Sequence, residues 1–202
     1  MADSNFGLSR IHLIRHGETE WSLTGQHTGR TDLPLTPRGE EKARQLGKQL
    51  QGIQFARVFT SPRQRAKRTG ELAGLSAAAE VEPDLAEWEY GDYEGQRTAD
   101  IRKTRPDWNI FEHGCPGGEM PEQISARADR LIARLRGIEG NVALFSHGHF
   151  GRVLAVRWIG LPVLDGQRLT LDTASVSILS FEHDRADSPV IALWNAGTQP
   201  VS

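Results

Sequence analysis

Short apolar runs alternate along this sequence with longer segments in which apolar residues recur every three or four positions. The apolar runs predict buried strands at 11–14, 58–60 and 142–145. The periodic segments predict helices at 36–51, from 61 to about 73, from 121 to about 135, and from about 150 to 159. Two final strands, 175–182 and 190–194, are expected to pair antiparallel. Alternating strands and helices favour an α/β fold, here a three-layer α/β/α sandwich with a mostly parallel, mixed sheet.

One segment departs from this alternation. Residues 84–120 are rich in Gly, Pro, Trp and charged residues, and only 98–104 look helical. We interpret the segment as a lid-like insertion, because long irregular stretches in compact domains commonly cover functional sites. The chain has 202 residues, so we expect residues 1–202 to form a single domain.

Composition excludes several classes of function. The formal net charge is −2, which argues against nucleic acid as a partner, although a small basic pocket is compatible with that sum. No apolar stretch is long enough to cross a membrane, and the first ten residues do not resemble a signal peptide. The sole cysteine, Cys115, permits no internal disulfide. These features predict a cytoplasmic protein.

Cationic and imidazole side chains follow three of the predicted strands. Arg15 and His16 come directly after the first strand, Arg65 lies at the start of the helix after the second, and His147 follows the strand at 142–145. Because the carboxyl ends of parallel strands meet at one edge of a sheet, we expect these side chains to converge. Arginine matches pairs of phosphate oxygens, and helix N-termini add N–H donors. The pattern therefore predicts a site for a phosphate monoester.

Five blocks of this sequence, in order, resemble the histidine phosphatase, or phosphoglycerate mutase-like, superfamily. They are LIRHGET at 13–19, TGRTDLPLT at 28–36, the segment from Ser61-Pro62 through Arg65-Ala66 to Thr69, EWEYGDYEG at 87–95, and SHG at 146–148. The resemblance implies a phosphoglycerate mutase-like fold and a metal-independent phosphatase that needs no cofactor. It further resembles the yeast-type sugar-bisphosphatase branch, which favours a sugar phosphate or bisphosphate among small phosphorylated metabolites.

The resemblance also implies a role for each matched residue. His16 would be the nucleophile that becomes phosphohistidine, and Glu87 would protonate the leaving alcohol. Arg15, Arg65 and His147 would bind the phosphoryl oxygens. The positions that match the substrate pocket are Ser22, Thr28, Gly29 and Tyr90, together with Arg15, Arg65 and His147.

Local pattern leaves close rivals for two of these roles. Arg65 lies on a charged helix with Arg63, Lys67 and Arg68, and Glu87 shares an acidic segment with Glu89 and Glu94. A solvated helix face and a solvated acidic loop are the plain alternatives. Only position within the family block selects Arg65 and Glu87. Three further histidines, His27, His113 and His149, are expected mainly to serve packing or to lie at the surface, with His27 a weaker candidate for substrate contact.

Three other functions compete with that of a histidine phosphatase. A mutase that returns the phosphoryl group to substrate would use the same central residues, but the segment at 108–119 is short and lacks the basic run expected of such enzymes. A catalytically inactive phospho-ligand binding protein would need to have lost a matched residue, and none is missing. A metal hydrolase built on His147 and His149 is weak, because no Asp cluster lies nearby in the sequence. The oligomeric state stays open, with a homodimer through a sheet edge as one arrangement.

Overall fold

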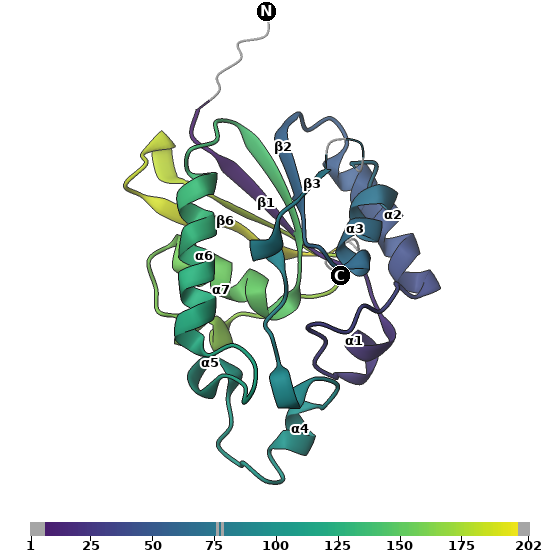
Figure 1. Cartoon of the computed structure of the whole chain (residues 1–202). Coiled ribbons are helices and arrows are strands. Elements are labelled where there is room, and N and C mark those ends of the chain that lie inside the picture. Colours follow the sequence, from purple (N-terminus) through teal and green to yellow (C-terminus); the bar gives the residue numbers. More distant parts are fainter. Residues whose placement is uncertain (1–6, 76, 78, 198–202) are drawn as a thin grey trace, which may run out of the picture.

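The computed structural model describes residues 7–75, 77 and 79–197, in which six strands form one mixed sheet (Figure 1). The strand order is β3-β2-β4-β1-β5-β6. The first four strands are parallel, β5 runs antiparallel to β1, and β6 runs antiparallel to β5. Their bounds are β1 Arg10–Arg15, β2 Phe55–Thr60, β3 Ala79–Val81, β4 Asn141–Ser146, β5 Val176–Phe181 and β6 Pro189–Ala196.

Helices cover both faces of the sheet, which confirms the predicted sandwich. The helices are α1 Glu20–Thr24, α2 Pro37–Leu50, α3 Gln64–Leu72, α4 Thr98–Ile101, α5 Ile110–His113, α6 Pro121–Leu135 and α7 Gly148–Trp158. In β4, Val142 and Leu144 join the cluster that contains α6 and α7, whereas Ala143 and Phe145 join the one that contains α2 and α3. Successive side chains of a strand point to opposite faces, so each central strand contributes to both layers.

Several local elements differ from the sequence prediction, among them α5, which lies in a stretch that was not expected to be helical. The strand β3 was not predicted, because it has three residues and carries a charged residue at its centre. The helix α1 was also not predicted; Thr19 caps it by accepting a hydrogen bond from the Ser22 N–H. The helix predicted at 98–104 is shorter than expected, since α4 ends at Ile101 and turns follow. The antiparallel pair at the end of the chain is present as β5 and β6.

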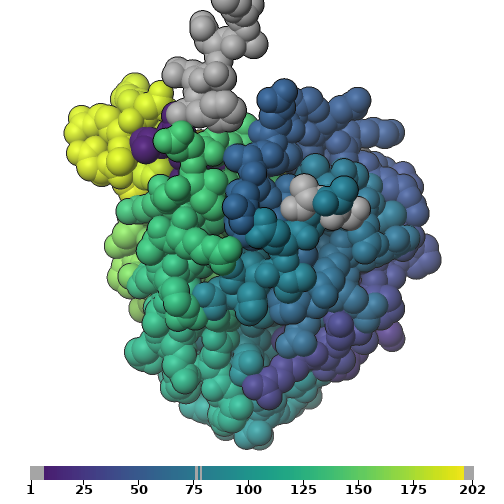
Figure 2. Space-filling model, turned by 45° about the horizontal axis from the view of Figure 1, so that its top comes forward, coloured from purple at the N-terminus to yellow at the C-terminus, as the bar shows by residue number. Residues whose placement is uncertain are grey.

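The segment 84–120 contributes to the main core rather than lying wholly on the surface. Its aromatic side chains Trp88, Tyr90, Trp108 and Phe111 are buried in the cluster that contains α6 and α7. The part around α4 lies at the lower end of the molecule in Figure 1, and the N-terminal segment with α1 (purple) lies close to it in both views (Figure 2). Movement of this segment as a lid stays a prediction.

The sheet register determines where the site forms. Arg15 at the end of β1 pairs with Ser146 at the end of β4, and Thr60 at the end of β2 pairs with Phe145. The backbone N–H of His16 donates to the Ser146 carbonyl at 3.0 Å. The residues that follow these three strands are therefore neighbours, although His16 and His147 are 131 positions apart in the sequence. Among the residues that the structure describes, no helix combines the length and apolar character needed to cross a bilayer.

Candidate active site

A cavity of about 250 Å³ opens beside the ends of β1 and β4. Arg15, His16 and Glu87 contribute to its wall, together with residues from α1, α4 and the start of α7. Of the predicted pocket residues, Arg15, Ser22, Thr28 and Tyr90 line the cavity, whereas Arg65 and His147 are fully buried and are not part of its lining. Gly29 lies outside this lining and instead donates its N–H to the Glu94 carboxylate while its carbonyl accepts from Arg65.

His16 is buried and held in one tautomer. Its Nδ1 lies 2.7 Å from the Gly17 carbonyl oxygen, an acceptor only, so Nδ1 carries the proton and donates. Nε2 of the neutral ring therefore keeps its lone pair. Burial, with the charges of Arg65 and Arg15, lowers the pKa of His16 well below 6.5, so the imidazole is neutral at physiological pH.

The loop after His16 is fixed by close backbone contacts. The Gly17 N–H donates to the hydroxyl oxygen of Thr69 at 3.0 Å, which ties this loop to α3. The first turn of α2 packs against the same loop, and a Cβ at Gly39 would lie 2.3 Å from the Glu18 carbonyl oxygen. Glycine at position 39 permits this approach, which keeps the carbonyl acceptor of His16 in place.

His147 lies next to His16, with ring centroids 5.1 Å apart. Its Nδ1 accepts from the Arg65 Nε–H at 3.2 Å, which leaves the proton on Nε2, and Nε2 lies 2.7 Å from the Ser61 hydroxyl oxygen. Burial and the neighbouring charge of Arg65 lower the pKa of His147 well below its ordinary value. The second histidine is therefore a neutral ring that presents a donor at Nε2.

Arg65 is fully buried, and the loop that carries the second sequence block surrounds it. Its guanidinium donates to the carbonyl oxygens of Thr28, Gly29 and Thr31 at 2.9, 3.2 and 3.0 Å. The neighbouring arginine Arg68 instead pairs with exposed carboxylates of α2 and α3. Contacts with residues far away in the sequence therefore distinguish Arg65 from its charged sequence neighbours.

Arg15 provides a second guanidinium at this edge, and its side chain is partly buried. Its Nη1 donates to the Leu171 carbonyl, and its Nε is buried without a hydrogen-bond partner among the described residues. Burial lowers the pKa of Arg15, while the negative charge of Glu87 opposes that shift. A desolvated cation with unused donors in a cavity wall favours binding of an anion.

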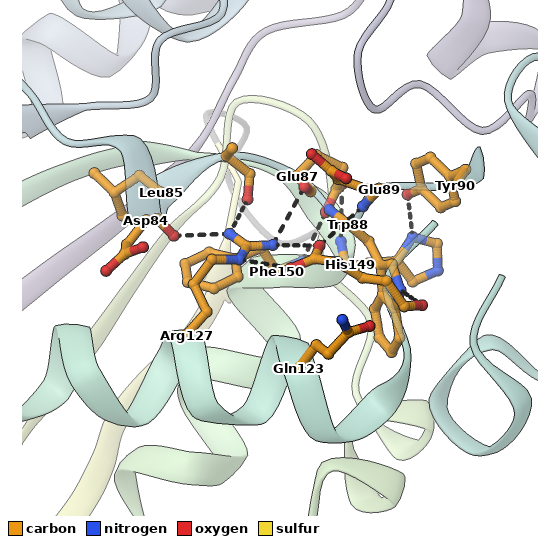
Figure 3. A network of polar contacts seen from close by, with 12 residues as sticks. Asp84, Leu85, Glu87, Trp88, Glu89, Tyr90, Gln123, Arg127, His149 and Phe150 are labelled. Carbon is orange, nitrogen blue, oxygen red and sulfur yellow. Dashed lines mark hydrogen bonds and ion pairs between the residues drawn. The ribbon is translucent and has the colours of Figure 1, made fainter. Parts of the chain in front are cut away.

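Glu87 is the one of the three acidic rivals that lines the cavity. Its Oε1 accepts from the backbone N–H groups of Trp88 and Phe150 at 2.9 and 2.8 Å, and its Oε2 accepts from that of His149 at 3.0 Å (Figure 3). Two of these donors belong to the first turn of α7, so the helix dipole also favours the carboxylate. By contrast, Glu89 pairs with exposed Arg30, and Glu94 binds backbone N–H groups at 29 and 31.

Arg127, on α6, binds the backbone of the segment 84–87 (Figure 3). Its Nη1 donates to the carbonyl oxygens of Asp84 and Ala86 at 2.8 and 2.7 Å, and its Nη2 reaches the Glu87 carbonyl at 3.3 Å. The same guanidinium forms a two-armed ion pair with Glu119 at 2.9 and 2.8 Å. Sequence reasoning missed Arg127, because its helix pattern resembles that of any solvated arginine.

Two further cavity residues from α7 were not assigned to the site from the sequence. A hydrogen bond of 2.7 Å joins Nδ1 of His149 to the Tyr90 hydroxyl oxygen, and Arg152 lines the cavity one helical turn after Gly148. Burial raises the pKa of Tyr90, so the hydroxyl stays protonated. The sequence could have indicated Arg152, because positions 148 and 152 are four residues apart and share a face of the helix. His27, the weaker candidate, also lines the cavity and stacks on Tyr90.

Comparisons with known proteins agree with this geometry. Residues 11–196 match the family model of the histidine phosphatase superfamily (branch 1). An acid phosphatase of Mycobacterium tuberculosis is 43% identical over 197 residues, with 96% of each chain covered. A sedoheptulose 1,7-bisphosphatase of Saccharomyces cerevisiae is 35% identical, with 95% of this chain and 94% of the yeast protein covered.

A solved structure of the open reading frame Rv3214 from Mycobacterium tuberculosis has a TM-score of 0.88 to this chain at 40% identity. The match covers 95% of this chain and 99% of that one. Both the extent of the family match and the identity to full-length relatives lead to one conclusion. The chain belongs to the histidine phosphatase superfamily, branch 1.

Proposed function

We propose that this protein is a phosphatase that hydrolyses a small phosphorylated metabolite, with His16 as the nucleophile. The observation that carries the proposal is the Nδ1–H contact of His16 to the Gly17 carbonyl, which leaves the Nε2 lone pair free in a cavity that also contains Arg15 and Glu87. Attack of Nε2 on phosphorus forms phosphohistidine, and water then hydrolyses it. The covalent route divides one difficult step into two easier ones.

The cations at the strand ends would stabilise the phosphoryl group as charge spreads over its oxygens. Arg15 offers unused N–H donors, and His147 offers its Nε2–H once the ligand replaces Ser61 as acceptor. Arg65 already donates to His147 and to three carbonyl oxygens, so it contributes mainly its charge and the orientation of His147.

Glu87 would act as the general acid and then as the general base. Both acceptor directions of Oε1 are taken by backbone N–H groups, whereas Oε2 has only the His149 N–H. The catalytic proton is therefore assigned to Oε2. It passes to the leaving alkoxide in the first step, and the carboxylate takes a proton from the attacking water in the second.

A sugar phosphate or bisphosphate is the proposed substrate class. Arg152 is a second cation in the cavity wall; it donates to the Gly166 carbonyl and lies over the Phe111 ring, and no described carboxylate lies within ion-pair distance of it. A substrate with a second anionic group would supply that partner. The yeast relative named as a sedoheptulose 1,7-bisphosphatase supports the same class.

The competing functions have less support. Both ring nitrogens of His147 are engaged by Arg65 and Ser61, an arrangement unsuited to a metal ligand. His16 and Glu87 are both present, which disfavours an inactive binding protein. Mutase activity is disfavoured by the short segment at 108–119. A cytoplasmic location and a homodimer through a sheet edge stay predictions.

Rapid-quench labelling tests the proposal. Wild-type protein mixed with a ³²P-labelled sugar phosphate should acquire acid-labile label, and His16→Ala should acquire none while keeping its circular dichroism spectrum. A screen of phosphorylated metabolites that scores released phosphate and isomerised product together separates hydrolysis from transfer. Turnover by folded His16→Ala at the wild-type rate would refute the nucleophile.

A further inference from the structure

An irregular loop, residues 28–31, lies between two charged side chains. On one side, the Arg65 guanidinium donates to three carbonyl oxygens of the loop, those of Thr28, Gly29 and Thr31. On the other side, both oxygens of the Glu94 carboxylate accept from the Gly29 N–H, at 2.9 and 3.0 Å. The Thr31 N–H donates to the same carboxylate at 2.9 Å. The loop therefore binds a cation through its carbonyl oxygens and an anion through its N–H groups.

The peptide group that joins Thr28 to Gly29 connects the two charges directly. Its carbonyl oxygen, which belongs to Thr28, accepts from Nη2 of Arg65 at 2.9 Å. Its N–H, which belongs to Gly29, donates to Glu94. Hydrogen bonds in such a chain polarise one another, so the carboxylate makes this carbonyl oxygen a stronger acceptor for the guanidinium.

The other contacts of Arg65 make this support important. Its side chain is fully buried, and its remaining hydrogen bond goes to Nδ1 of His147, a neutral acceptor. Among the described carboxylates, only that of Asp32 lies within ion-pair distance, at 4.0 Å from Nη1, and 44% of that side chain is exposed. Neutral acceptors hold a guanidinium less firmly than a carboxylate does. The position of Arg65 therefore depends on how firmly the loop itself is held.

Glycine at position 29 allows the loop to approach the segment that carries Glu94. A Cβ at this position would lie 2.6 Å from the Trp88 carbonyl oxygen and 3.0 Å from Oε2 of Glu94. The first distance is too short for any side chain, so a larger residue would displace the loop. Gly29 thus has a packing role at this point, outside the lining of the cavity.

We propose that Glu94 is a positioning residue for Arg65, which it orients through the peptide group between Thr28 and Gly29. The inference rests on the proposed function, because Arg65 is assigned there to the phosphoryl site. Loss of the carboxylate would leave the buried Gly29 N–H without its acceptor and would release the loop. Arg65 would then lose its fixed acceptors, and the orientation of His147 would be lost with them.

Calorimetric titration of the full-length protein with inorganic phosphate tests this role. Glu94→Leu removes both acceptor oxygens and should weaken phosphate binding by about tenfold or more. Glu94→Gln keeps one oxygen that can accept from Gly29 and Thr31, so it should recover part of that loss. Glu89→Leu is the matched control, because it removes the same charge from the same segment but breaks only an exposed ion pair with Arg30. This control should bind phosphate as the wild-type protein does.

A double-mutant cycle separates a positioning role from general support of the fold. In an Arg65→Lys background, the ammonium group cannot contact the three carbonyl oxygens as the planar guanidinium does. Glu94→Leu should therefore weaken phosphate binding far less in that background than in the wild-type protein. Equal losses in the two backgrounds would overturn the inference, as would wild-type phosphate affinity of folded Glu94→Leu.

Amide hydrogen exchange gives a measurement on the wild-type protein, in case the variants do not fold. The N–H groups of Gly29 and Thr31 should exchange slowly, although they lie outside helices and strands. Saturating phosphate should slow their exchange further, because opening of the loop releases Arg65. Exchange that phosphate binding leaves unchanged contradicts the inference. The phosphohistidine labelling of His16 does not depend on this result, so the two proposals can fail separately.

Discussion

Replacement of Arg127 by methionine should reveal how strongly α6 supports the site. Arg127 and Glu119 are both nearly buried, with 12% and 14% of their side chains exposed. Arg127→Met keeps the length of the stem but leaves the Glu119 carboxylate and the Ala86 carbonyl without this donor. Breaking a buried pair by removing one partner costs about 3–5 kcal/mol. For a chain of this size, that loss lowers the melting temperature by roughly 6–20 °C.

Arg130→Met is the matched control for this experiment. Arg130 lies on the same helix and pairs with Asp84 at 2.7 Å, but 62% of its side chain is exposed, so its loss should cost below about 1 kcal/mol. Urea unfolding at neutral pH measures both variants. Because the donor to the Glu87 carbonyl is also lost, Arg127→Met should slow alkyl phosphate hydrolysis under conditions where it stays folded. Equal stability of the two variants would refute the assigned role of Arg127.

Three further predictions concern the acid, the buried histidines and metal ions. Glu87→Gln should reduce hydrolysis of alkyl phosphates by about 10²–10⁴-fold and that of aryl phosphates with good leaving groups far less; equal losses for both would contradict the acid role. Burial lowers the pKa of His27 from 6.5 to about 4. Between pH 6.5 and pH 4, His27 binds a proton in the unfolded chain but not in the native protein. The free energy of unfolding should therefore be about 3 kcal/mol lower at pH 4 than above pH 6.5. Urea unfolding at both pH values should show that His27→Asn loses less stability at low pH than the wild-type protein does. An equal loss in the two proteins would refute the role of His27 in this pH dependence. EDTA should leave the hydrolysis rate unchanged; inactivation reversed by a divalent cation would favour a metal mechanism.

The strand ends were predictable because their signal is local. An apolar run followed by a cation or a histidine indicates where a buried strand ends, and β1 and β4 follow that pattern. The family blocks then selected Arg65 and Glu87, which the structure places at the expected edge. Hydrogen bonds distinguish these two residues from their rivals: Arg65 donates to carbonyl oxygens of the loop at 28–31, and the Glu87 carboxylate accepts from a backbone N–H at the start of α7.

The missed residues have roles that depend on distant partners. Arg127 acts on a segment about 40 positions earlier in the sequence, and no local pattern identifies that contact. His149 reaches the site because of the direction in which α7 leaves β4. The buried aromatic residues of 84–120 were also ambiguous, since tryptophan and tyrosine in a Gly-rich segment suit either a mobile loop or a core. Only the packing against α6 and α7 distinguishes the two.

The central position of β1 has a consequence for biosynthesis. This strand lies between β4 and β5, so each of its hydrogen-bonding edges needs a partner that is encoded more than 120 positions later. At about 5–20 residues per second, roughly 7–26 s separate the synthesis of residue 15 from that of residue 146. During that interval the nascent chain exposes an unpaired apolar strand on the ribosome. Chaperone contact with the N-terminal segment should therefore decline only after β4 emerges.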